Sequence, residues 1–239
     1  MALLLVALMA CNPDPGELDQ GVEYRDGTDG GGMSGERGTV KISEILWSGT
    51  VTNDGTWDPT EQFIEIRNEG VRNMNISGWR LEVEGSRMIT YIVPQTDVVI
   101  PVGEQIVIAN KEGQCLRNVD ILIPDLSLPY GDPFRITLMD MDEHLIEPAG
   151  NKMMPPYAGV YDGQVSRSME KVALMFGGRG SEPTAWHHAT DGSLFDEGQY
   201  DRNYRPDNIA EECRQRTFAT PGEGNSPDYS GNQSFGGFE

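Results

Sequence analysis

Apolar and polar residues alternate along most of the chain between residues 39 and 220. This period-two pattern places successive side chains on opposite faces of an extended strand, so it predicts half-buried antiparallel strands. Turn residues separate the strands, and no stretch has the spacing of an amphipathic helix. The alternating runs are Ile64/Ile66, Trp79/Leu81/Val83, Ile89/Tyr91/Val93, Ile106/Ile108, Ile121/Ile123, Phe134/Ile136/Leu138 and Val172/Leu174/Phe176.

Strands of this kind predict an all-β domain, folded as a two-sheet sandwich of the Greek-key type. We expect this domain to span residues 39–221. One strand, residues 40–47, is irregular because its apolar phase changes at Ser43 and Glu44. The change predicts either a β-bulge at this point or a Glu44 side chain that points inward and accepts hydrogen bonds.

The first ten residues read MALLLVALMA and lead directly into Cys11. An apolar run this short matches the central region of a signal peptide rather than a membrane span. Leu8, Ala10 and Cys11 resemble the lipobox of bacterial lipoproteins, in which the cysteine is lipidated after cleavage. The resemblance implies a signal peptide at 1–10, a lipid anchor on Cys11 and, from Asn12, placement at the outer membrane. An ordinary signal peptide or a cloning artefact is the alternative interpretation.

Two other segments are rich in Gly, Asp, Glu and Pro or Ser, and poor in large apolar residues. Such segments bury too little surface to offset the entropy of ordering. We therefore expect a flexible acidic linker over residues 11–38 and a disordered tail over residues 222–239.

Three cysteines occur, and Cys11 is assigned to the lipid anchor, which leaves Cys115 and Cys213. Two cysteines in an exported protein predict one disulfide bond. Two buried free thiols are the alternative.

The formal net charge of the chain is -20. A surface this negative repels phosphate backbones, so nucleic acid is not an expected partner. The charge suits a protein outside the cytoplasm that binds a basic protein or a divalent cation, and a solvated acidic surface with no specific ligand is the plain alternative.

Several segments of the chain form a recognisable series of motifs. They are Val40–Ile45, Glu61–Asn68, Asn75–Leu81 and Pro101–Ile108, followed by Ser166–Glu170, Trp186, Thr220–Gly222 and Asn225. In this order they resemble the lamin-tail domain family, which has an immunoglobulin-like β-sandwich fold and shows Ser-x-x-Arg-like and Trp positions and a Thr-Pro-Gly ending late in the domain. The resemblance implies a core position for Trp79 and a tight turn at Gly78.

No familiar catalytic or zinc-binding motif occurs in the sequence. His187 and His188 are adjacent, so on a strand they point to opposite faces and do not bind one ion together. We expect both of them to face solvent near a strand end. Asp140, Asp142, Glu143 and His144 form an acidic turn.

The only candidate cofactor is calcium, with Asp54, Asp58 and Glu61 as candidate ligands. The alternative is an acidic loop that faces solvent. The sequence thus predicts a non-catalytic lipoprotein of the cell envelope whose module binds a protein or a polysaccharide. Two other functions stay open: an accessory part of an extracellular hydrolase system, and a calcium-stabilised adhesion module.

Overall fold

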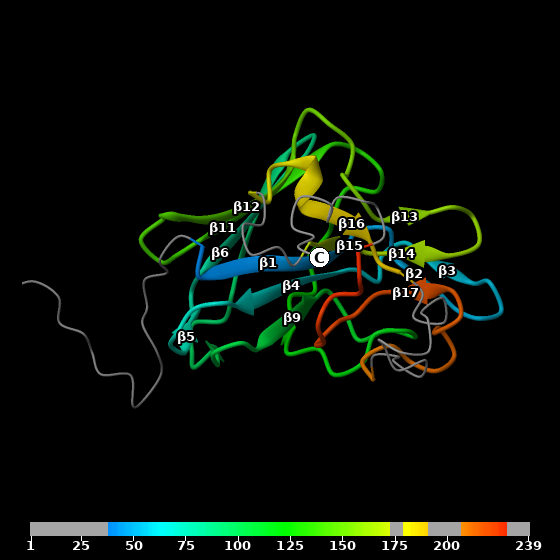
Figure 1. Ribbon diagram of the computed structural model, residues 1–239, viewed down its shortest axis with the longest axis horizontal. Coiled ribbons are helices and arrows are strands. Elements are labelled where there is room, and N and C mark those ends of the chain that lie inside the picture. Colours follow the sequence, from blue (N-terminus) through cyan, green and yellow to red (C-terminus); the bar gives the residue numbers. More distant parts are fainter. Residues whose placement is uncertain (1–37, 173–178, 191–206, 229–239) are drawn as a thin grey trace, which may run out of the picture.

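The computed structural model describes residues 38–172, 179–190 and 207–228, and these residues form an all-β fold (Figure 1). The predicted signal peptide, Cys11 and the linker up to residue 37 lie outside the described residues, as do Leu174 and Phe176. Among the described residues the one helical element is a short 3-10 turn, η1 (Pro183–Ala185). None of the described helices is long and apolar enough to cross a membrane.

Two main sheets make an immunoglobulin-like β-sandwich. The larger sheet has the strand order β10-β9-β4-β1-β15-β16, and the smaller has the order β12-β11-β6-β7. The strands of the larger sheet are β1 (Val40–Leu46), β4 (Phe63–Asn68), β9 (Gln105–Ala109), β10 (Ile121–Leu122), β15 (Met169–Lys171) and β16 (Trp186–His188). Those of the smaller sheet are β6 (Arg80–Glu84), β7 (Met88–Ile92), β11 (Phe134–Met139) and β12 (Leu145–Asn151).

Short strands extend the ends of the sandwich. One three-stranded sheet has the order β13-β14-β17, and β2 pairs with β3 and β5 with β8. Most pairs are antiparallel as predicted, but β9 with β10 and β14 with β17 are parallel. These short strands are β2 (Thr50–Val51), β3 (Trp57–Asp58), β5 (Met74–Asn75), β8 (Val99–Ile100), β13 (Val160–Tyr161), β14 (Ser166–Arg167) and β17 (Thr217–Phe218).

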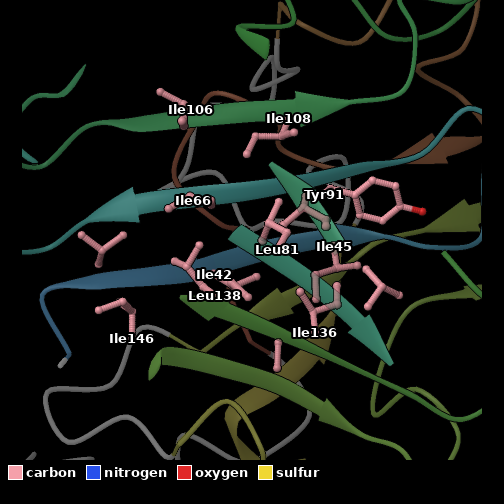
Figure 2. Packing of buried hydrophobic residues seen from close by; sticks show 14 of the residues in the cluster. Ile42, Ile45, Ile66, Leu81, Tyr91, Ile106, Ile108, Ile136, Leu138 and Ile146 are labelled. Carbon is pink, nitrogen blue, oxygen red and sulfur yellow. The ribbon is translucent and has the colours of Figure 1, made fainter. Parts of the chain in front are cut away.

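The core lies between the two main sheets, where the predicted alternation places the apolar face of each strand. Ile42, Ile45 and Ile66 of the larger sheet belong to the same buried cluster as Leu81 and Ile136 of the smaller one (Figure 2). The predicted core residue Trp79 is completely buried in this cluster. Gly78 adopts a φ of +73° immediately before it, which a residue with a Cβ adopts only with strain.

The outer face of the larger sheet is also covered. Phe63 and Val107 belong to a second buried cluster on this face, together with the two cysteines, whose sulfur atoms are bonded at 2.07 Å. The covering chain includes residues 207–228. In a sheet covered on both faces, consecutive residues of a strand are buried whichever face they point to, as at Phe63, Ile64, Glu65 and Ile66.

The predicted disordered tail at 222–239 starts too early. Asn225 Nδ2 donates to the carbonyls of Ser43 and Lys171, at 2.9 and 2.8 Å, and Ser226 is buried. Residues 222–228 therefore belong to the folded domain, because their polar groups find buried partners on the sheet. Residues 229–239 lie outside the described residues.

Candidate functional site

Four ionisable residues form a row across the outer face of the larger sheet. Glu44 on β1 lies opposite Glu65 on β4 and opposite Glu170 on β15, and Glu170 in turn lies opposite His187 on β16. We call these residues the carboxylate row. Each of the three glutamates is at most 1% exposed.

The irregular strand β1 has both of the features considered for it, a β-bulge and a buried, hydrogen-bonded Glu44. The pairing of β1 with β4 shifts register between Ile42 and Glu44, which is a β-bulge. The bulge lets Ile42 and Ile45 both face the sandwich core while Glu44 turns to the other face, where it is buried and hydrogen-bonded.

The segment Thr217–Asp228, which we call the closing segment, lies over the carboxylate row and supplies its donors. Thr220 N donates to Glu44 at 2.9 Å, Gly222 N to Glu65 at 2.8 Å and Ser226 N to Glu170 at 2.8 Å. Buried backbone N–H groups need acceptors, and each carboxylate accepts one of them. The Thr-Pro-Gly motif thus fastens the end of the domain to its central strands.

Burial makes the three glutamates weaker acids than glutamates usually are. Desolvation raises the pKa of Glu44 to about 7, although hydrogen bonds from Ser168 and Thr220 act against the rise. Desolvation and the nearby Glu44 charge raise the pKa of Glu170 to about 8, and the same causes raise the pKa of Glu65 well above its usual value.

The carboxylate row has the perturbed acidity of many catalytic sites but not their accessibility. A general acid or base must come within hydrogen-bond reach of a substrate. Glu44 and Glu170 are 0% exposed, and the closing segment occupies their lone pairs. These carboxylates therefore have a structural role, because they hold the closing segment on the sheet.

His187 and His188 point to opposite faces, as predicted for neighbours on a strand. His187 is buried, with Nε2 at 3.7 Å from Glu170 Oε2, whereas His188 is exposed. The expectation that both histidines face solvent is wrong for His187, because residues of the closing segment cover the outer face at β16. Burial lowers the pKa of His187.

The three candidate calcium ligands are not brought together. Among the described residues, the grouping that places three possible ligand atoms within 4.8 Å of one another is Asp140, Asp142 and His144. In this grouping Asp140 already accepts the backbone N–H of Asp142 at 2.9 Å and of His144 at 2.8 Å. The acidic turn is thus organised by its own hydrogen bonds.

Glu61 is completely buried, and its carboxylate accepts hydrogen bonds from neighbouring parts of the chain. It accepts the backbone N–H groups of Cys115, at 3.0 Å, and Leu116, at 2.8 Å, and the hydroxyl of Thr50 at 2.5 Å. It therefore fixes the chain around the Cys115–Cys213 disulfide, whose two residues are buried and 98 positions apart.

Asp54 and Asp58 shape the loop that precedes Glu61. Asp54 accepts the backbone N–H of Thr56 at 3.0 Å, and the Thr52 hydroxyl is the main cause of its lowered pKa. Partial burial acts to raise the pKa of Asp58, but contacts with Lys111 and Thr60 outweigh it and lower that pKa. Lys111 Nζ lies 2.6 Å from Asp58 Oδ2.

This loop also carries an aromatic feature that has no local sequence signal. Trp57 stacks on Tyr161, with ring centroids 4.4 Å apart and planes at 14°, and it contacts Tyr130 at 5.2 Å. Tyr130 in turn contacts Trp47 at 5.7 Å. We call these four residues the aromatic cluster. They are distant in sequence, so no local pattern brings them together.

Close backbone packing positions Trp57. A Cβ on Gly49 would lie 2.2 Å from the carbonyl oxygen of Asp58, so only glycine allows β3 to approach this bend. Trp57 Nε1 donates to the Ser48 carbonyl at 3.0 Å, and Ser48 Oγ lies 2.7 Å from Ser166 Oγ. Ser166 pairs with Tyr161, which completes the link between the stacked rings.

Gln62 positions the other half of the aromatic cluster. Its buried amide donates to the Trp47 carbonyl at 2.7 Å, donates to the Leu128 carbonyl at 3.1 Å and accepts the Leu128 N–H at 2.8 Å. The amide thereby joins the end of β1 to the loop that carries Tyr130. Of the four rings, Tyr130 is the most exposed, at 45%, and Trp47 is buried.

The first part of the folded domain matches a known protein family. Residues 34–150 match the family model of the lamin tail domain. The match supports the lamin tail domain family. It is a non-catalytic, immunoglobulin-like family, in agreement with the sandwich. No curated protein matches the chain.

The folded unit extends beyond the part that matches. β1 takes its second neighbour from β15, and the carboxylate row takes its donors from the closing segment, both of which follow residue 150. The folded sandwich therefore includes residues up to 228.

Proposed function

We propose that this chain is a non-catalytic binding module of the bacterial cell envelope, held at the outer membrane by a lipid on Cys11. The lipobox-like residues Leu8–Cys11 and the acidic linker motivate the anchor. The lamin tail domain supplies a rigid sandwich with loops at both ends, which is the usual arrangement of a binding module.

The observation that carries the proposal is the disulfide. Cys115 and Cys213 are both at most 1% exposed and join chain segments 98 residues apart. Disulfides persist in oxidising compartments and are rare where thiols are kept reduced. A buried disulfide in the folded domain therefore supports export, which a lipid anchor at the outer membrane requires.

The environment of the ionisable residues supports a binding role over catalysis. Within the described part of the chain, the three glutamates with raised pKa values lie beneath the closing segment. The net charge of -20 disfavours nucleic acid as the ligand and leaves a protein or a polysaccharide.

The anchor is tested by expressing the chain in a Gram-negative host, separating the membranes and measuring the intact mass. The expected species begins at Cys11, carries the added mass of three acyl chains and sediments with the outer membrane. A Cys11→Ala variant should keep its leader, carry no acyl mass and be absent from the outer membrane. An Ala2→Lys variant, which adds a basic residue before the apolar run, should process at least as well.

A chain that keeps Met1 in both the parent and the Ala2→Lys variant would refute the anchor. So would a chain cut at another position without added lipid. The state of Cys115 and Cys213, determined from non-reduced peptides of the same sample, tests the oxidising compartment separately.

A further inference from the structure

The aromatic cluster lies at the end of the sandwich where short strands gather. Figure 1 shows β3 and β13 at this same end, together with β2, β14 and β17. Trp57 belongs to β3 and Tyr161 to β13, whereas Tyr130 lies in the loop before β11. The end is thus formed by three segments held in place by buried hydrogen bonds, such as those of Gln62.

We propose that this end of the domain binds a neutral polysaccharide chain on the ring surfaces of Tyr130, Trp57 and Tyr161 that their mutual contacts leave exposed. Sugar rings carry C–H groups that pack on aromatic faces, and large rigid rings give contact area at a low entropic cost. The inference deepens the proposed function, because it names the ligand class of a module placed in the envelope.

Exposure of the rings supports a role beyond core packing. Tyr130 is 45% exposed, and Trp57 and Tyr161 are partly exposed, while the core tryptophans Trp79 and Trp186 are at most 2% exposed. A tyrosine exposes a phenol that both donates and accepts hydrogen bonds. A surface of partly wet aromatic rings is suited to ligands that are apolar on one side and polar on the other.

Carboxylates accompany each exposed ring along the chain. Asp58 follows Trp57 directly, Asp162 follows Tyr161 directly, and Asp132 follows Tyr130 after one glycine. Asp132 and Asp162 are exposed, whereas Asp58 is paired with Lys111 and adds no net charge of its own. Carboxylate oxygens accept hydrogen bonds from sugar hydroxyls, and they repel anionic polymers. The local charge thus favours a neutral polysaccharide over an acidic one or a nucleic acid.

The test is electrophoresis of the full-length Cys11→Ala chain through native gels that contain a dissolved polysaccharide. Hydroxyethyl cellulose, laminarin and dextran are the neutral probes, and polygalacturonate is the anionic control. We expect at least one neutral probe to retard the chain and polygalacturonate to leave it unaffected. Tyr130→Ala and Tyr161→Ala should each raise the dissociation constant about tenfold.

Two further variants distinguish binding at the aromatic rings from nonspecific binding. Tyr130→Phe keeps the ring and should weaken binding less than Tyr130→Ala. Met88→Ala removes a side chain that is 62% exposed on β7 of the smaller sheet, and it should bind as the parent does. Near-ultraviolet circular dichroism of each variant checks that the fold is retained.

Retardation by no neutral probe would overturn the inference and leave a protein as the ligand of the module. Unchanged binding in both tyrosine-to-alanine variants, or an equal loss in Met88→Ala, would overturn the assignment of the site. Because the anchor is absent from every sample, these results do not depend on lipidation. The intact-mass measurement tests the lipid anchor on Cys11 and does not test polysaccharide binding.

Discussion

Glu44 and Glu170 lie opposite each other on β1 and β15, and both carboxyl groups contact one hydroxyl, Thr220 Oγ1, at 3.0 Å. A hydroxyl has a single proton to donate. When both contacts are hydrogen bonds, one carboxyl must therefore carry a proton and donate it to Thr220. The geometry agrees with the raised pKa values of both glutamates.

Because one carboxyl of the Glu44–Glu170 pair holds a proton, we expect alkaline conditions to destabilise the domain. A pKa raised in the folded state, to about 7 for Glu44 and about 8 for Glu170, means that the folded chain binds protons that the unfolded chain has released. The stability from these groups is fully present below the unfolded pKa of about 4.5 and is lost as pH rises through the folded values. Urea unfolding should thus give a smaller free energy at pH 9 than at pH 7.

His187 acts in the opposite sense, but in a different pH range. Its pKa is lowered from 6.5, so the stability it contributes is lost as pH falls below that value. Above pH 7.5 His187 is largely neutral in both states. Burial lowers the pKa of Lys171, which acts against the glutamates at alkaline pH, so the glutamate contribution is measured as the difference between the slopes of a glutamate variant and the parent. Glu44→Gln should flatten the slope by up to one proton, and a slope identical to that of the parent would contradict the shared proton.

The closing segment should contribute measurably to stability. Asn225 bridges the Ser43 and Lys171 carbonyls on β1 and β15, so Asn225→Ala leaves two buried acceptors without their donor. We expect a loss of about 2 kcal/mol in the free energy of unfolding by urea. The neighbouring Glu223 is exposed, and Glu223→Ala should change this free energy by less than about 0.5 kcal/mol. Equal effects of the two substitutions would show that the bridge is not what matters.

The disulfide should contribute more than any single contact, because it closes a loop between residues 98 positions apart. In the chain-entropy account a loop of this length stabilises the folded state by about 4.7 kcal/mol. Cys115→Ala combined with Cys213→Ala should lower the free energy of unfolding by about this amount. The Cys11→Ala chain is the matched parent, and reduction of it with dithiothreitol should reproduce the loss. A change below about 1 kcal/mol would contradict the entropic role.

The sandwich and its core could be predicted from the sequence because they follow from local patterns. Alternation fixed the faces of strands such as β9, whose Ile106 and Ile108 enter the core while Val107 faces the other way. The irregularity at Glu44 also had a local signal. In both cases one strand carries the whole pattern, so no knowledge of its partners is needed.

The ordering of residues 222–228 in the closing segment and the aromatic cluster could not be predicted, because distant residues decide them. Residues 222–228 have the composition of a disordered tail, yet buried glutamates on the sheet accept their N–H groups. Likewise, the spacing of Asp54, Asp58 and Glu61 suggested one calcium site. Lys111 instead pairs with Asp58, and the amides of Cys115 and Leu116 occupy Glu61.

Gly49 provides a sharp test of how the aromatic cluster is held. With φ at +76°, Gly49→Ala carries the left-handed strain of about 1 to 2 kcal/mol, and its Cβ would also lie 2.2 Å from the Asp58 carbonyl oxygen. We expect a total loss of about 3 kcal/mol or more and a weaker near-ultraviolet signal from Trp57. Gly103 has a similar φ of +80° with nothing within 4 Å, so Gly103→Ala reports the backbone strain alone. If both substitutions cost the same, the close approach of β3 is not what positions Trp57. A larger loss at Gly49, accompanied by the spectral change, would show that this contact holds the ring in the cluster.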